Sequence, residues 1–259
     1  MKDVFMLPRR FKIFSIFLVL LNFSLGAQAQ TSPNSQLKHR VFFIGDSTMA
    51  TKNGYGDAVC DWLKGHAECL NLAKNGRSSK SFKEEGLWVQ ALDQMKNNPN
   101  QMKQWVLIQF GHNDQPGKPG RSTDLATEYP KNLSIYVTDA RAQGATPILV
   151  TPLSRRSFKN GSLQHDLADW AASMREVANQ LKVPLIDLNS MSHQKIIEVG
   201  EERADLYAET PKGTPKFDRT HLGPLGACVF GALVLNQLPV ATSGELAVTT
   251  DKNCEAAIK

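Results

Sequence analysis

Residues 41–48 read Val-Phe-Phe-Ile-Gly-Asp-Ser-Thr, an apolar run that passes directly into a short polar turn. The four apolar residues are β-branched or aromatic, which predicts a buried β-strand. The turn that follows would carry Ser47 to the edge of a sheet, with its hydroxyl and backbone N–H accessible. This geometry suits a nucleophile, although on this tripeptide alone an ordinary helix-capping role for Gly-Asp-Ser is the more common explanation.

Similar strand-like runs recur along the chain, with helical patterns between them. After residues 41–44, the predicted strands are Cys69–Ala73, Trp105–Phe110, Pro147–Thr151 and Pro184–Leu188. Apolar residues recur at three- and four-residue steps from Asp166 to Leu181, which predicts a helix. A last helix is expected from Pro224 to about Leu238, with proline at its start. Strands that alternate with helices predict an α/β fold, a three-layer α/β/α sandwich around a five-stranded parallel sheet.

Three of the predicted strands end in polar turns that contain glycine. These turns are residues 45–48, Asn75-Gly76-Arg77-Ser78 and Gly111-His112-Asn113-Asp114. In parallel α/β sheets, ligands bind beyond the carboxyl ends of the strands. We therefore expect the three turns to meet on one rim and to carry the chemistry.

A serine nucleophile needs a base within hydrogen-bond distance, and the base needs a partner that fixes its tautomer. Among the histidines, His221 stands out because Asp218 precedes it by three residues, in a loop flanked by proline and glycine. One short loop could then deliver both groups to Ser47. In isolation, a capping aspartate beside a surface histidine is the more frequent explanation of such a pair.

Acyl transfer also needs hydrogen-bond donors for the oxyanion of the tetrahedral intermediate. Successive strand ends offer three: the backbone N–H of Ser47, the backbone N–H of Gly76 and the side-chain amide of Asn113. Taken singly, Gly76 and Asn113 are typical turn residues. Their coincidence with Ser47 and the Asp-His pair favours a catalytic role.

These blocks resemble, in order and spacing, those of the SGNH (GDSL) hydrolases. The resemblance covers nearly all of the chain after residue 30. It implies that Ser47 is the nucleophile, that Gly76 and Asn113 complete the oxyanion hole, that His221 is the base and that Asp218 orients it.

A narrower resemblance is to the rhamnogalacturonan acetylesterases. It rests on residues 45–50, Gly54-Tyr55-Gly56, residues 75–79, Phe110–Asp114, Thr220-His221-Leu222-Gly223 and Gly226-Ala227. The resemblance implies a flavodoxin-like sandwich and a serine esterase that removes acetyl groups from a plant cell-wall polysaccharide, through an acyl-enzyme and without a metal or organic cofactor. It leaves open an SGNH esterase or lipase acting on simple acyl esters and, further off, a non-catalytic carbohydrate-binding protein.

The chain departs from this pattern in two polar loops, between Gln115 and Thr127 and around Arg155–Ser162. We expect these loops to line a sugar site, because a lipase usually offers an apolar approach to its nucleophile. His112 and Arg77 are the candidate substrate contacts. Arg77 could pair with the carboxylate of an acidic sugar such as galacturonate. For His112, a role in positioning the Asn113 turn is the stronger expectation, and a solvated or structural arginine remains the commoner role for Arg77.

The N-terminus has the pattern of an export signal. A basic stretch runs into about a dozen apolar residues and ends in Ala27-Gln28-Ala29, a small-x-small cleavage site. The apolar run is shorter than the roughly 20 residues that a membrane span needs. We therefore expect residues 1–29 to be removed, leaving one esterase domain, residues 30–259, secreted or periplasmic and free of the membrane.

The net charge and the length of the chain limit which partners and how many domains we expect. Loss of residues 1–29 removes four basic side chains and one acidic side chain, so the formal net charge falls from +5 to +2. The remaining charges are scattered, which argues against a nucleic-acid partner. About 230 residues suffice for a single α/β domain with its own core, which we expect to be a monomer acting on an acetylated polysaccharide or oligosaccharide.

The four cysteines all lie in the part that would be exported, where disulfides form readily. Their spacing favours two local links, Cys60 with Cys69 and Cys228 with Cys254, over buried free thiols. None of the spacings is that of a zinc site.

Overall fold

The structure is a computed structural model that describes Met1, residues 37–250 and residues 253–257. The predicted signal peptide, apart from Met1, lies outside the described residues. Its cleavage and the domain boundary at residue 30 therefore stay predictions.

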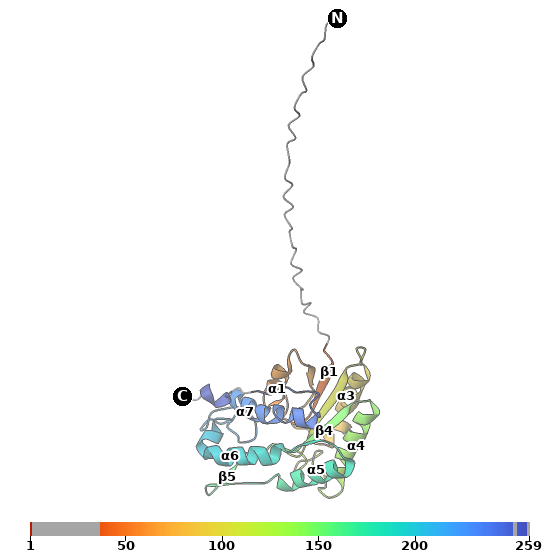
Figure 1. Cartoon of the computed structure of the whole chain (residues 1–259). Coiled ribbons are helices and arrows are strands. Elements are labelled where there is room, and N and C mark those ends of the chain that lie inside the picture. The colour runs from red at the N-terminus through yellow and green to blue at the C-terminus, as the bar shows by residue number, and fades with distance from the viewer. Residues whose placement is uncertain (2–36, 251–252, 258–259) are drawn as a thin grey trace. The chain divides into compact units, whose positions relative to one another are not determined.

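A five-stranded, all-parallel sheet forms the centre of the described chain (Figure 1). Its strands are β1 (His39–Gly45), β2 (Glu68–Asn71), β3 (Lys103–Gln109), β4 (Thr146–Val150) and β7 (Leu185–Ile186). The spatial order is β2-β1-β3-β4-β7, which is the flavodoxin-like order 2-1-3-4-5 when the five strands are counted along the chain. The predicted sheet is confirmed, and its switch point lies between β1 and β3.

Helices cover both faces of the sheet, as the alternation of side chains along β1 requires. Val41 and Phe43 point into one core, and Phe42 and Ile44 point into the other. The helices of the first layer are α1 (Gly56–Leu63), α6 (Leu188–Asp205), α7 (Pro224–Leu235) and α8 (Leu238–Ala241). Those of the second layer are α2 (Ser81–Glu84), α3 (Leu87–Lys96), α4 (Glu128–Ala142) and α5 (Ala168–Leu181). A small antiparallel hairpin, β5 (Phe158–Lys159) with β6 (Ser162–Leu163), and a short 3-10 helix, Cys254–Ala257, complete the described elements.

Several elements were predicted to extend beyond their observed ends; the strand predicted to run to Ala73, for example, ends at Asn71. The last strand ends at Ile186 instead of Leu188, because the Asp187 side chain caps the next helix by accepting from the Ser190 N–H. The last predicted helix divides, since α7 ends at Leu235 and Pro239 stands in the first turn of α8.

The segment Pro224–Ala241 is long and apolar enough, by composition, to cross a membrane. Its described residues form α7 and α8, and Phe230, Val234 and Leu238 are fully buried in the first core. Packing against the sheet accounts for the apolar character of these three positions.

Both predicted disulfides are present. Cys60 on α1 bonds to Cys69 on β2, and Cys228 on α7 bonds to Cys254 in the 3-10 helix. The second link ties the C-terminal 3-10 helix to α7, the helix that follows the His221 loop.

Candidate active site

Ser47 lies in the turn that directly follows β1. Asp46 shapes this turn, because its Oδ1 accepts hydrogen bonds from the Thr48 N–H and the Thr48 hydroxyl, both at 2.9 Å. Gly54 and Gly56 pack against the same turn so closely that a Cβ atom at either position would lie 2.4 Å or less from backbone atoms of Thr48 or Met49. The close approach holds Ser47 in a fixed position, with only 5% of its surface exposed.

The predicted base reaches the predicted nucleophile. His221 Nε2 lies 2.9 Å from Ser47 Oγ, and His221 Nδ1 lies 3.1 Å from Asp218 Oδ2. His221 and Asp218 sit in the loop just before α7, and His221 is 174 residues away from Ser47 in sequence. With Nδ1 donating to the carboxylate, Nε2 is left unprotonated and able to accept the serine proton.

Asp218 is fixed from both sides of its carboxylate. Its Oδ1 accepts from the backbone N–H of Thr220 and of His221, both at 2.7 Å, while Oδ2 faces the imidazole. Burial alone would raise the pKa of Asp218, but these hydrogen bonds outweigh it and hold the pKa below its ordinary value. The carboxylate is therefore ionised at neutral pH and favours the Nδ1–H tautomer of His221.

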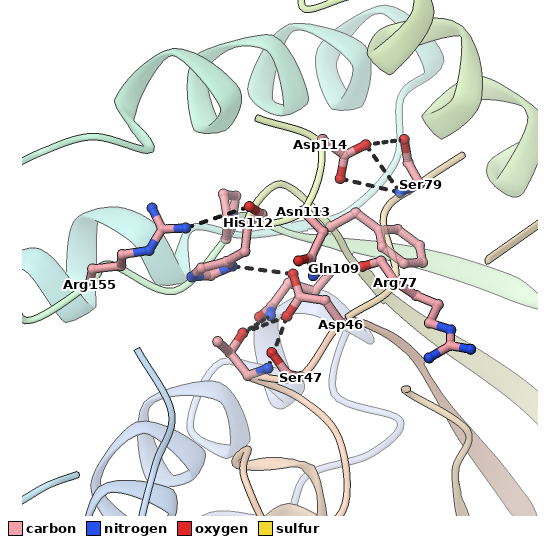
Figure 2. Close-up of polar contacts among 12 residues, drawn as sticks. Asp46, Ser47, Arg77, Ser79, Gln109, His112, Asn113, Asp114 and Arg155 are labelled. Atoms are coloured by element: carbon pink, nitrogen blue, oxygen red, sulfur yellow. Dashed lines mark hydrogen bonds and ion pairs between the residues drawn. The ribbon is translucent and has the colours of Figure 1, made fainter. Parts of the chain in front are cut away.

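A second His-Asp pair lies in the same region but is buried. His112 Nδ1 is 3.2 Å from Asp46 Oδ2, and these two side chains are 3% and 0% exposed (Figure 2). Burial raises the pKa of Asp46, yet His112 and Thr48 together bring it below its ordinary value. The Thr48 hydroxyl also accepts from Gln109 Nε2 at 2.7 Å, and Gln109 Oε1 accepts from the Tyr55 hydroxyl at 2.7 Å. This buried network fixes the ends of β1 and β3 relative to each other.

The three predicted oxyanion donors come from adjacent strand ends. The Lys74 N–H donates to the Gly45 carbonyl at 3.0 Å, which brings the turn after β2 beside Ser47. Gly76 adopts a φ of +76°, a conformation that a side chain would strain. In the described part of the chain, no acceptor takes the N–H of Ser47 or of Gly76. Both groups are available to a ligand.

Asn113 is oriented by one of its own amide hydrogens. Its Nδ2 donates to the Arg77 carbonyl at 3.1 Å, which leaves the second Nδ2 hydrogen available to a ligand. The next residue, Asp114, anchors the turn by accepting from the Ser79 N–H at 3.1 Å (Figure 2). The turns after β2 and β3 are thus tied together at two points.

A pocket of about 420 Å³ opens beside the Ser47 turn. It is lined by Ala50, Thr51, Ala73, Lys74, Asn75, Arg77 and Leu87. In the described chain, no three His, Cys, Asp or Glu side chains gather in a way that could hold a metal ion. The site offers a nucleophile, a base, an orienting carboxylate and neutral hydrogen-bond donors, which are the groups that acyl transfer requires.

Comparison with known proteins agrees with this chemistry. Residues 43–227, which span the Ser47 turn to the start of α7, match the GDSL-like Lipase/Acylhydrolase family. The chain belongs to this family. As a member of the GDSL-like family it is a carboxylic ester hydrolase.

Two curated relatives come from Bacillus subtilis. The probable rhamnogalacturonan acetylesterase YesY is 34% identical over 205 residues, which cover 76% of this chain and 91% of YesY. The rhamnogalacturonan acetylesterase RhgT is 33% identical over 210 residues, which cover 75% of this chain and 87% of RhgT.

Solved structures support the fold. The Bacillus subtilis protein YxiM superimposes with a TM-score of 0.64 at 22% identity, over 80% of this chain, which spans only 58% of the YxiM chain. The acetyl xylan esterase Axe2 from Geobacillus stearothermophilus superimposes with a TM-score of 0.60 at 16% identity, covering 84% of this chain and 98% of Axe2.

The structure brings Ser47, His221 and Asp218 together as predicted, whereas the two candidate substrate contacts are engaged within the chain. Arg77 is already engaged within the chain, since its guanidinium pairs with Glu85 at 2.6 Å and donates to the Asn75 carbonyl at 2.8 Å. His112 is held by Asp46 as described. Substrate contacts by either residue stay predictions.

Sequence reasoning missed Arg156, which braces the loop that carries the base. Its side chain is fully buried, and its Nη2 donates to the His221 carbonyl at 2.8 Å. The Arg156 N–H donates to the Arg219 carbonyl at 2.9 Å, so side chain and backbone both hold the 218–221 loop. Burial lowers the pKa of Arg156 to about 10, which still leaves it protonated at neutral pH. Only the polar character of the 155–162 loop hinted at a role here.

Proposed function

We propose that this protein is an exported serine esterase that removes O-acetyl groups from a plant cell-wall polysaccharide, of the rhamnogalacturonan or pectin type. The observation that carries the proposal is the continuous hydrogen-bonded chain from Ser47 through His221 to Asp218, with open donors beside it. The substrate follows the names of YesY and RhgT, and the export follows the predicted signal segment.

In the proposed reaction, Ser47 Oγ attacks the carbonyl carbon of the acetyl ester while His221 Nε2 takes the hydroxyl proton. The carbonyl oxygen becomes an oxyanion, which the N–H groups of Ser47 and Gly76 and the Asn113 amide stabilise. The ester C–O bond then breaks, and the sugar hydroxyl leaves with the proton from His221. Water, deprotonated by His221, attacks the acetyl-enzyme, and acetate departs as the proton returns to Ser47.

The approach to Ser47 favours a hydrated substrate. The pocket next to the Ser47 turn is lined by Lys74, Asn75 and Arg77 as well as by apolar residues, and the neighbouring loop that follows Asn113 is rich in polar residues. A polysaccharide presents hydroxyl and carboxylate groups that such a surface can bind, whereas a lipid chain would need an apolar approach.

Acetate release from a panel of substrates tests this proposal. Wild type and Ser47→Ala would each be assayed on four substrates: acetylated rhamnogalacturonan, acetylated homogalacturonan, acetylated xylan and a small aryl acetate. We expect release from the pectic polymers, and a loss in Ser47→Ala of at least about 10³-fold in kcat, as is typical when a nucleophile is removed. Undiminished activity in Ser47→Ala would exclude the mechanism, and preference for xylan would exclude the pectic substrate.

A fluorophosphonate probe separates the nucleophile from the choice of substrate. Wild type should gain the mass of one phosphonyl group on Ser47, and Asp218→Ala should label more slowly. Failure of wild type to label would count against an activated Ser47, whatever the substrate panel gives.

A further inference from the structure

Three cationic side chains surround the backbone of the proposed oxyanion hole. Lys118 Nζ donates to the His112 carbonyl at 2.7 Å, and Arg155 Nη2 approaches the same oxygen at 3.5 Å (Figure 2 shows Arg155). Arg121 Nη1 donates to the Gly76 carbonyl at 3.3 Å. The positive charges thus contact the carbonyl of Gly76 and the carbonyl of His112, the residue that precedes Asn113.

These cations differ in how their charge is balanced. Arg155 pairs with Asp166. In contrast, among the residues that the structure describes, no carboxylate lies within 4.0 Å of the charged nitrogens of Lys118 or Arg121, whose partners are neutral carbonyls. Burial lowers the pKa of Lys118, the positive charges of Arg155 and Arg121 lower it further, and the more distant Asp46 and Asp114 offset part of this effect. An anion placed here would relieve this repulsion.

The loop that carries Lys118 and Arg121 is held in shape by its own hydrogen bonds. The Ser122 hydroxyl accepts from the Lys118 N–H at 2.8 Å and lies 2.8 Å from the Gln115 carbonyl, to which it donates. The Arg121 N–H donates to the Lys118 carbonyl at 3.0 Å. A loop that is already ordered loses little conformational entropy when it binds a ligand.

There is room for a ligand beside this loop. A hollow of about 340 Å³ is lined by Lys80, Gly117, Lys118, Pro119, Gly120 and Ser122. Lys80 pairs with Glu128 at 3.1 Å, so Lys118 is the lysine of this lining that has no carboxylate within 4.0 Å, and Arg121 lies between the lining residues Gly120 and Ser122 in sequence. Within the described chain, the side chains of Lys118 and Arg121 each donate one hydrogen bond, and both keep further N–H donors for an incoming group.

We propose that Lys118 and Arg121 form a subsite that binds the carboxylate of a uronic acid residue in the acetylated polymer. This inference rests on the proposed function, and it assigns the anionic character of the substrate to the loop after Asn113. An acetylated neutral polymer such as xylan would leave both cations without a counter-ion, so the subsite selects between polymers that carry the same ester.

The test compares two forms of one polymer. Acetylated rhamnogalacturonan would be set against the same polymer after carboxyl reduction and re-acetylation to equal acetyl content. The measured quantity is the selectivity ratio, kcat/KM for the uronate form divided by kcat/KM for the reduced form. For wild type we expect a ratio of about 10 or more, since two charge-assisted hydrogen bonds are involved, and a decline of the ratio with added salt.

Charge-removing and charge-keeping variants identify the residues. Lys118→Gln and Arg121→Gln should each lower the ratio, and the double variant should bring it close to 1. Lys118→Arg and Arg121→Lys should retain a ratio near that of wild type. The matched control is Lys96→Gln, which should leave the ratio unchanged. Lys96 is an exposed lysine at the end of α3, just before β3 begins, so it lies toward the amino ends of the strands and away from the carboxyl ends that carry the site.

Two results would overturn the subsite. One is equal turnover of both polymers by wild type, and the other is a ratio that persists in the double variant. Aryl acetate hydrolysis and phosphonyl labelling of Ser47 in wild type report on the esterase itself. If these hold while the ratio fails, only the subsite is wrong, and if they are absent, the proposed function is wrong.

Discussion

Asp114 should make the folded protein less stable as the pH rises from acid to neutral, and Asp114→Asn should remove this dependence. The carboxyl group is fully buried beneath the Asn113 turn, where it accepts from the Ser79 N–H at 3.1 Å and from the Thr123 hydroxyl at 3.2 Å. Burial raises the pKa of Asp114 from 3.8 to about 7, and the nearby charge of Asp46 adds to the rise.

The sign and size follow from linkage between protonation and folding. Between pH 4 and pH 7 the folded protein keeps a proton on Asp114 that the unfolded chain has released, so the stabilisation is complete below pH 3.8 and is lost as pH approaches 7. At 1.36 kcal/mol per pKa unit, the interval between 3.8 and about 7 corresponds to about 4 kcal/mol. Asparagine has the same shape and does not ionise, and its oxygen can still accept from Ser79.

Urea denaturation of wild type and Asp114→Asn across pH 4–8 measures this effect. The free energy of unfolding of wild type should fall relative to that of the variant by about 3–4 kcal/mol over the window. Asp124→Asn is the matched control in the same loop. The hydroxyl and N–H of Thr127 lower the pKa of Asp124, so the contribution of Asp124 has the opposite sign and appears only at more acid pH. Equal pH slopes for wild type and Asp114→Asn would refute the reasoning.

Two further variants test the donors and the support of the base. Asn113→Ala should lower kcat by about 10²–10³ with little change in KM, because its free amide hydrogen serves the oxyanion and not the ground state; an unchanged kcat on rhamnogalacturonan and aryl acetate would remove Asn113 from the oxyanion hole. Arg156→Met should lower kcat by about tenfold or more, because it leaves the buried His221 carbonyl unpaired at a cost of about 1–3 kcal/mol. Arg156→Lys should restore part of this activity. A positioning role would be contradicted if Arg156→Met had the same kcat as wild type at every pH of the profile.

The sheet and the blocks around it could be predicted from the sequence because their signals are local. The strand before Ser47 is a run of apolar residues, and a glycine-containing polar turn marks its end. Asp218 and His221 are three residues apart, so one loop delivers both. The disulfides also followed from sequence spacing, since Cys60 and Cys69 are nine residues apart and Cys228 and Cys254 are 26 residues apart.

The features that were missed depend on contacts between distant segments. Arg156 binds the His221 carbonyl across 65 residues, and nothing in its own neighbourhood distinguishes it from a surface arginine, the usual state of this residue. Lys118 and Arg121 matter because the loop returns to the His112 and Gly76 carbonyls. The length of the last strand was misjudged because Asp187 caps a helix where the apolar pattern would continue a strand.

The two His-Asp pairs near Ser47 have similar groups but differ in burial, and this difference assigns one pair to structural support and the other to proton transfer. In the buried pair, Asp46 also holds Thr48, so His112 is part of a fixed network that reaches Tyr55 through Gln109. In the outer pair, the His221 side chain is 33% exposed and its free nitrogen faces Ser47 at 2.9 Å. A base must exchange protons with substrate and water, which a fully buried imidazole cannot do readily, whereas oxyanion donors gain from a framework that does not relax. The buried pair therefore holds the donors in place, and the exposed pair is the one equipped to move the proton.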